Sequence, residues 1–173
     1  MIRDTALLGT RLVLGGYLAV HGAQKLFGAF GGRGLEATGA GFDAIGPAPG
    51  KQMAVVAGVS ELGGGLLTAA GIADPLGPLT LIGTMAVASA THRAKGPLAA
   101  RGGFELPLTN LAAAAALAAA AAVGAALAAG SLARLLSARP AAADELRSAA
   151  ADEPARAGAG TAVPEAAGTG EER

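Results

Sequence analysis

Long apolar runs separated by short polar stretches fill most of the chain. Four runs are long enough to be considered as membrane-spanning helices: residues 5–28, 52–72, 75–91 and 107–132. A spanning helix needs roughly 17–25 residues, so the third run is marginal in length and the other three suffice. The pattern predicts an all-α protein, namely an integral membrane four-helix bundle.

Three polar stretches predict the connections between these helices. The first is rich in glycine and proline, and Leu35, Phe42 and Ile45 within it are spaced for a short turn on the membrane surface. The second is a tight turn around Asp74, and the third is a basic loop that begins near His92. Short connections make consecutive helices antiparallel neighbours.

The end of the chain has a different pattern. From about Ser137 it becomes rich in Ala, Pro, Glu and Arg, without periodicity. Such segments cannot bury enough apolar surface to fold alone, so we expect disorder, with one helical turn at most over residues 144–150. The predicted domains are a transmembrane domain at 1–136 and a disordered tail at 137–173.

Composition supports a membrane environment. The chain is 52% hydrophobic and 15% charged, with one Tyr, four Phe and no Trp, and its mean hydropathy is +0.48. Soluble domains carry about 25% charged residues. Four consecutive apolar helices without an amphipathic partner argue against a soluble bundle. Arg11 interrupts the first run and no clear cleavage site follows, which argues against a secretory signal.

Charge and cysteine usage exclude several function classes. The formal net charge is zero, so the chain has no electrostatic footprint for nucleic acid. It contains no cysteine, which excludes disulfides, thiolate metal sites and cysteine-ligated iron–sulfur clusters. No metal-ligand spacing stands out, and we expect no covalently bound cofactor. His21 and His92 could ligate a haem by their placement, but nothing else indicates a haem pocket.

Polar residues of the first apolar run share one face. With Arg11 as the origin and 100° per residue, Lys25 lies about 40° away and His21 about 80° away in the same direction. Charges at mid-bilayer cost about 2.5–3.5 kcal/mol each, so such residues usually face the bundle interior and have partners. The face therefore predicts a polar stripe directed at another helix.

Glu61 lies near mid-depth in the second run and is the natural partner of this stripe. Gly58 and Gly65 lie on its own face, and small residues there let a neighbouring helix approach closely. Gly15 and Gly22 do the same on the first run. An ionised Glu61 needs a cation from that neighbour.

Either Arg11 or Lys25 can supply the cation. In one interpretation the ion pair only fixes the register of the two helices. In the other, Arg11, His21, Lys25 and Glu61 form an intramembrane polar cluster that lines a ligand site or a proton path. A third interpretation, strongest for Lys25, is snorkelling at the lipid surface.

A second polar group is expected at one membrane surface, where the ends carrying Lys25, His92 and Glu105 meet. Asn110 follows one turn into the fourth run. We predict that His92, Glu105 and Asn110 form a vestibule leading toward Glu61. Glu105 has an equally good structural explanation, since an acid near a helix N-terminus is favoured by the helix dipole.

Two motifs resemble the DoxX family of small bacterial membrane proteins. They are RLVLGGYLAVHGAQKLFGAFGG at residues 11–32 and GVSELGGGLLTAAGI at 58–72. The family's first helix ends in His-Gly-x-x-Lys and its second carries Glu-Leu-x-Gly-Gly. The matching residues here are His21, Gly22, Lys25, Glu61, Leu62, Gly64 and Gly65. The resemblance extends over about residues 8–131 and implies a four-helix integral membrane protein.

The family name derives from a relationship to membrane subunits of a thiosulfate:quinone oxidoreductase. The resemblance thus implies a quinone-linked redox role in sulfur or oxidative-stress metabolism. Without a redox group of its own, the chain would bind quinone or serve a protein partner that carries the redox centre. The alternatives are a membrane scaffold for partner proteins without catalysis and, less favoured, a small transporter.

We expect a multi-pass protein of the bacterial inner membrane, with the lipid bilayer as its surroundings. The count of basic residues leans toward termini outside. The long polar tail is easier to leave in the cytoplasm than to translocate, so we favour cytoplasmic termini.

Overall fold

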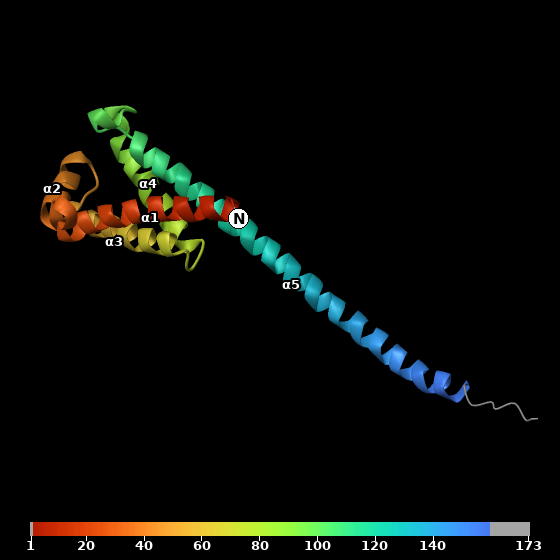
Figure 1. Ribbon diagram of the computed structural model, residues 1–173. Helices are drawn as coiled ribbons and strands as arrows, with labels where there is room; N and C mark the ends of the chain where they lie inside the picture. Colours follow the sequence, from red (N-terminus) through yellow and green to blue (C-terminus); the bar gives the residue numbers. More distant parts are fainter. Residues whose placement is uncertain (1, 160–173) are drawn as a thin grey trace, which may run out of the picture. The chain divides into compact units, whose positions relative to one another are not determined.

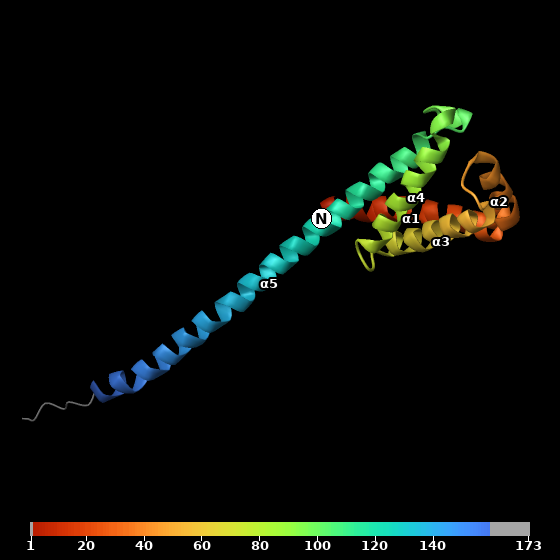
Figure 2. The same ribbon diagram turned by 180° about the vertical axis from the view of Figure 1, so that it is seen from behind.

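The computed structural model describes residues 2–159, which form five α-helices and three short 3₁₀ turns (Figures 1 and 2). The chain divides into two compact units, Met1–Ala125 and Ala126–Arg173. Figure 1 labels the helices in chain order. They are α1 (Ile2–Phe27), α2 (Gly34–Ile45), α3 (Gly50–Ala70), α4 (Leu76–His92) and α5 (Glu105–Ala159).

The closest helix pair is α1 with α3, and the two helices run antiparallel (Figure 1). Gly15 of α1 faces Gly65 of α3, while Gly22 faces Gly58. A Cβ atom built on Gly15 would lie 2.5 Å from the carbonyl oxygen of Gly65, so only glycine fits this approach. The predicted contact between small-residue faces is therefore confirmed.

The first connection forms a full helix, α2, where the sequence predicted only a short turn. Two polar contacts attach α2 to the start of α3. The backbone N–H of Gly50 donates to Asp43 Oδ1 at 2.7 Å, and Lys51 Nζ donates to Glu36 Oε1 at 2.5 Å. Satisfying a free N–H at the start of α3 stabilises that helix end.

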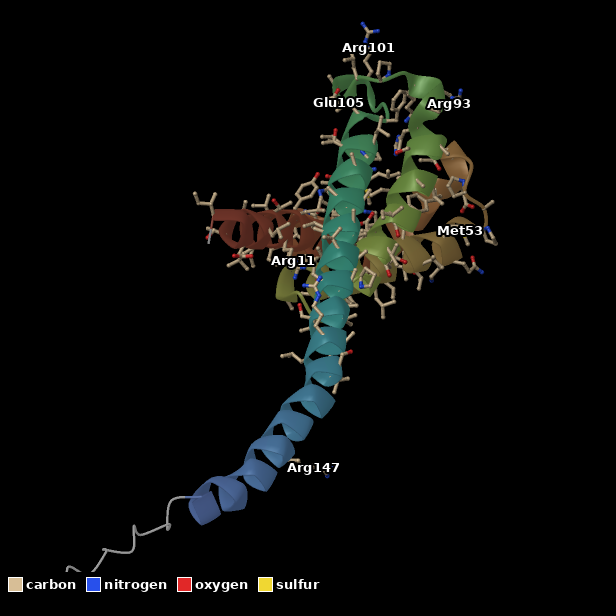
Figure 3. The ribbon with its side chains drawn as sticks, turned by 90° about the vertical axis from the view of Figure 1, so that its right-hand side faces the viewer. Arg11, Met53, Arg93, Arg101, Glu105 and Arg147 are labelled. Carbon is tan, nitrogen blue, oxygen red and sulfur yellow. The ribbon has the colours of Figure 1, made fainter. Side chains whose placement is uncertain are left out.

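The α4–α5 hairpin crosses the α1–α3 pair instead of lying parallel to it (Figures 1 and 3). A hydrophobic core of fully or nearly buried side chains packs α1 against α4 and α5. Its members are Leu14, Leu18, Leu81, Met85, Ala114 and Leu117. The all-α fold is confirmed, whereas a four-helix bundle is not.

Among the described residues, two helices are long and apolar enough to cross a membrane. They are Gly50–Ala70 and the part of α5 at Glu105–Ser137. They coincide with the second and fourth predicted spans. The helix α4 has 17 residues, and α1 carries Arg11 and Lys25 within its length. Spans through α1 and α4 stay predictions.

The tail differs from the sequence prediction. The helix α5 has 55 residues and continues to Ala159, so residues 137–159 are helical where we expected disorder. Alanine has the highest intrinsic helix propensity, and ten of the residues in this segment are alanine. A prediction based on burial alone overlooks this local preference. Residues 160–173 lie outside the described part, and a domain boundary at 136/137 stays a prediction.

Candidate functional site

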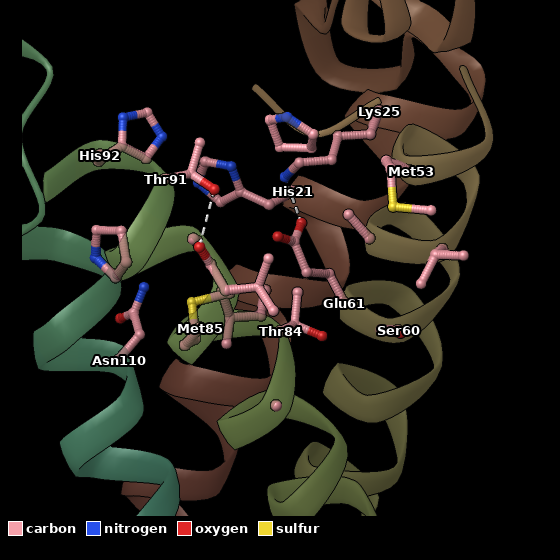
Figure 4. Close-up of a pocket in the computed structure, with 18 of the residues that line it drawn as sticks. His21, Lys25, Met53, Ser60, Glu61, Thr84, Met85, Thr91, His92 and Asn110 are labelled. Carbon is pink, nitrogen blue, oxygen red and sulfur yellow. Dashed lines mark hydrogen bonds and ion pairs between the residues drawn. The ribbon is translucent and has the colours of Figure 1, made fainter. Parts of the chain in front are cut away.

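A pocket of about 640 Å³ lies among α1, α2, α3, α4 and the first turns of α5 (Figure 4). This volume is within the range of small-molecule sites, about 300–1,000 Å³. Apolar side chains form much of its wall. Those that contribute from several helices are Leu18, Phe42, Met53, Val56, Met85 and Val87. The few polar groups on the wall therefore decide what the pocket can bind.

The main polar feature of the pocket is an ion pair between α1 and α3. Lys25 Nζ donates a hydrogen bond to Glu61 Oε2 (Figure 4). The Glu61 side chain is 6% exposed and that of Lys25 is 22% exposed. Of the two cations that the sequence left open, Lys25 supplies the counter-charge. A buried carboxylate of this kind is stable only because the ammonium remains beside it.

Helix register explains why Lys25 meets Glu61. Because Gly22 faces Gly58 and Leu62 across the antiparallel pair, Glu61 is level with the turn of α1 that holds His21. Side chains of an α-helix tilt toward its N-terminus, so Lys25 leans back by about one turn toward that level. The pair thus follows from the glycine contacts that set the register.

His21 lies next to this pair on the pocket wall (Figure 4). Its ring meets that of Tyr17, one turn earlier, edge to face, with centroids 4.4 Å apart and an interplanar angle of 69°. Residues four apart share a helix face, which places both rings at the pocket. The contact with Tyr17 orients the imidazole beside the Lys25–Glu61 pair.

Arg11 lies apart from this group, so the structure brings together His21, Lys25 and Glu61 of the expected polar cluster but not Arg11. Its guanidinium forms an ion pair with Asp74 in the α3–α4 turn and lies against Gly71. Arg11 and His21 are ten residues apart on α1, about 15 Å along the axis. The helical wheel placed Arg11 on the side of α1 that faces α3. It carried no information about which residue of α3 or of the α3–α4 turn lies opposite Arg11.

Two of the three residues of the predicted vestibule line the pocket, and the vestibule itself stays a prediction. His92 and Asn110 line the same pocket as Glu61 (Figure 4). His92 Nδ1 lies 2.8 Å from the carbonyl oxygen of Gly102. A carbonyl only accepts, so Nδ1 carries the hydrogen and Nε2 of a neutral ring is left as an acceptor.

Glu105 is not among the residues that line the pocket. Its Oε2 accepts a hydrogen bond from the backbone N–H of Ala99 at 3.0 Å. The carboxylate thereby holds the loop before α5 by a hydrogen bond, which is a structural contact other than the expected one with the helix dipole.

Comparison with protein-family models gives one family, DoxX, which matches residues 6–94. The chain belongs to the DoxX family. The match runs from α1 to the end of α4 and contains His21, Lys25 and Glu61. No curated protein matches the chain, and no solved structure matches it.

The sequence analysis missed a row of hydroxyl groups on the pocket wall of this DoxX protein. Thr80, Thr84 and Thr91 all line the pocket from α4. Each donates to a carbonyl four residues earlier, at 2.9, 3.1 and 2.9 Å. Their oxygens keep lone pairs that can accept hydrogen bonds. The sequence pattern could have predicted this row, because positions 80, 84 and 91 fall within about 40° on a helical wheel.

The arrangement combines proton-exchanging groups with an apolar cavity. A carboxylate, an ammonium and an imidazole meet at one wall, and hydroxyl oxygens line the α4 side. Such a site can donate hydrogen bonds to a polar head group and accept them from it, while apolar walls hold the rest of the ligand. Among the side chains that the structure describes, no three of His, Cys, Asp or Glu gather as a metal site.

Proposed function

We propose that this DoxX protein is a quinone-binding membrane subunit whose protein partner carries the redox centre. The observation that supports the proposal is the pocket of about 640 Å³ with the buried Lys25–Glu61 pair on its wall. A quinone ring is flat and apolar and presents carbonyl oxygens that need hydrogen-bond donors. Lys25 and His21 are donors at one wall of the pocket.

The chain's own residues would handle charge and protons at the ring. When bound, a quinone supplies the capacity to accept electrons and protons. Lys25 would orient one ring oxygen and hold Glu61 in place. Glu61 Oε2 and the His21 ring would hold or release the proton, and the hydroxyl oxygens of Thr84 and Thr91 would accept from ring hydroxyls. The apolar wall would exclude water around the ring.

Purification in mild detergent followed by lipid extraction tests the proposal. We expect quinone to co-purify with the wild-type protein and with Gly16→Leu, but not with Gly83→Leu. A Cβ at Gly83 or Gly16 meets no atom within 4 Å, so both variants should fold. Only Gly83 lines the pocket. If the wild-type protein retains other lipids but no quinone, the result would favour the alternative function, a membrane scaffold for partner proteins without catalysis.

We further propose that the protein crosses the bacterial inner membrane four times, with both termini in the cytoplasm. Tags placed at positions 1, 40, 74, 100 and 173 can be mapped for accessibility in sealed vesicles. Positions 1, 74 and 173 should be accessible from the cytoplasmic side and positions 40 and 100 from the other. A mixed pattern would end the four-span proposal without affecting the pocket.

A further inference from the structure

A groove between α1 and α5 adjoins the pocket. It has a volume of about 450 Å³, and eight residues form its walls: Ala6, Gly9, Thr10, Val13, Leu14, Tyr17, Asn110 and Ala113. Tyr17 and Asn110 also line the pocket that contains Glu61. The groove and the pocket therefore meet at these two side chains.

The groove differs from the pocket in chemistry. None of its lining residues is charged, and the Thr10 hydroxyl already donates to the carbonyl oxygen of Ala6 at 2.9 Å. Val13 on its wall is 73% exposed. A Cβ at Gly9 would meet no atom within 4 Å. The groove is thus an open apolar channel, whereas the pocket holds the ion pair and the imidazole.

The length of the groove indicates the shape of its occupant. The lining residues of the groove on α1 run from Ala6 to Tyr17, eleven residues apart and about 16 Å along the helix axis. A single ring cannot extend over this distance, but a long alkyl or isoprenoid chain attached to the ring can. The ion pair and the imidazole lie on the pocket side of Tyr17, and only uncharged side chains line the groove beyond it, which matches the junction between a head group and a tail.

Resting on the proposed function, we propose that the ligand is a long-tailed, membrane-soluble quinone whose tail lies in the α1–α5 groove. Its ring occupies the pocket and its chain leaves between Tyr17 and Asn110. The ligand reaches the pocket sideways from the bilayer and not through the surface near His92. This assigns the substrate class to quinones that carry a long apolar tail.

Photolabelling in lipid nanodiscs tests this assignment. Three benzoquinone probes are used. Two have a hexadecyl chain, with a diazirine on the ring in one and at the chain end in the other, and the third has a ring diazirine and a methyl group in place of the chain. We expect the ring probe to label peptides near His21 and Lys25. The chain-end probe should label α1 between Ala6 and Leu14 and α5 near Ala113.

A matched pair of variants locates the tail. Gly9→Leu adds a side chain inside the groove. Gly16→Leu adds the same side chain to α1 outside both cavities. Overpacking should lower chain-end labelling of the groove about tenfold in Gly9→Leu. Labelling by a ring probe with a methyl group in place of the chain should be unchanged. Gly16→Leu should behave as wild type with every probe.

The outcomes separate the two proposals. If the ring probes do not label the pocket of the wild-type protein, the proposed quinone function fails. If they do, but chain-end labelling is spread over other helices or is unchanged in Gly9→Leu, only the tail assignment fails. Equal labelling of the groove by a phospholipid with a diazirine in its acyl chain, not competed by long-tailed quinone, would also overturn it.

Discussion

The two ends of the α1–α3 pair carry the same kind of contact in different surroundings. At one end Lys25 meets Glu61 beside the pocket, and the carboxylate is 6% exposed. At the other end Arg11 meets Asp74 beside the α3–α4 turn, with both side chains slightly more than 20% exposed. Neither Arg11 nor Asp74 lines the pocket.

This difference shows that the surroundings of an ion pair decide whether it can act on a bound molecule. The Arg11–Asp74 pair ties α1 to a turn, and water or lipid head groups can partly solvate it. The Lys25–Glu61 pair faces a cavity, where a ligand can replace the missing solvent. Both pairs can fix helix register, but only the second lies where it can act on a bound molecule. Four predictions test this contrast.

The largest effect is expected when the buried pair is broken. Lys25→Met leaves the Glu61 carboxylate without its cation, which typically costs about 3–5 kcal/mol in the free energy of unfolding. Glu61→Gln should also destabilise, and the double variant should recover much of the loss. Thermal unfolding in detergent, followed by helical circular dichroism, measures these changes.

The double variant also separates a structural pair from a working one. A stable double variant that no longer retains quinone supports a working site, whereas full retention supports a register function only. Strictly additive losses in the double variant would contradict the Lys25–Glu61 pairing itself.

The next largest effect is expected at the glycine contacts of α1 with α3. These contacts set the register of the two helices, on which both ion pairs depend. A Cβ in Gly22→Ala would lie 2.6 Å from the carbonyl oxygen of Gly58. Overpacking of this kind costs about 1–3 kcal/mol. Gly16→Ala is the matched control, because a Cβ there meets nothing within 4 Å. The same unfolding assay should show a loss only in Gly22→Ala, and equal behaviour would refute the close approach.

A smaller effect is expected at the Arg11–Asp74 end. Partly exposed ion pairs are worth about 0–1 kcal/mol, so Arg11→Gln should lower stability by about 1 kcal/mol or less. Asp74→Asn is the companion variant. Co-purified quinone should match that of the wild type in both. A loss of quinone in Arg11→Gln with unchanged stability would show that Arg11 belongs to the site after all.

The smallest effect is expected in the tail. Truncation after Pro140 removes residues whose apolar members are alanine except for Leu146 and Val163, so they have little surface to bury. Expression and thermal unfolding in detergent should stay the same as for the full chain. The truncated chain keeps every residue of the pocket and the groove, so quinone retention should also be equal. A large loss of folded protein would show that the tail stabilises the helices before it.

Much of the site was predictable, but only as separate parts. Helix periodicity placed His21 and Lys25 on one face of α1, and the Gly58–Gly65 spacing predicted a close neighbour on the face of Glu61. The Thr80–Thr84–Thr91 row was also present in the pattern. The crossing of the α4–α5 hairpin over α1–α3 was not, since it depends on core packing among residues far apart in the chain.

The sequence by itself determined the helices α1, α3 and α4 and the first part of α5, the polar face of α1, the close approach of α1 to α3 and membership in the DoxX family. Only the tertiary structure decided that Glu61 pairs with Lys25 and that Arg11 pairs with Asp74. The physical reason is that the angle of a residue around its helix is a local property, set by 3.6 residues per turn. The level at which it meets another helix depends on the register of two separate segments. That register is set by backbone contacts such as Gly15 with Gly65, which form only when the helices pack.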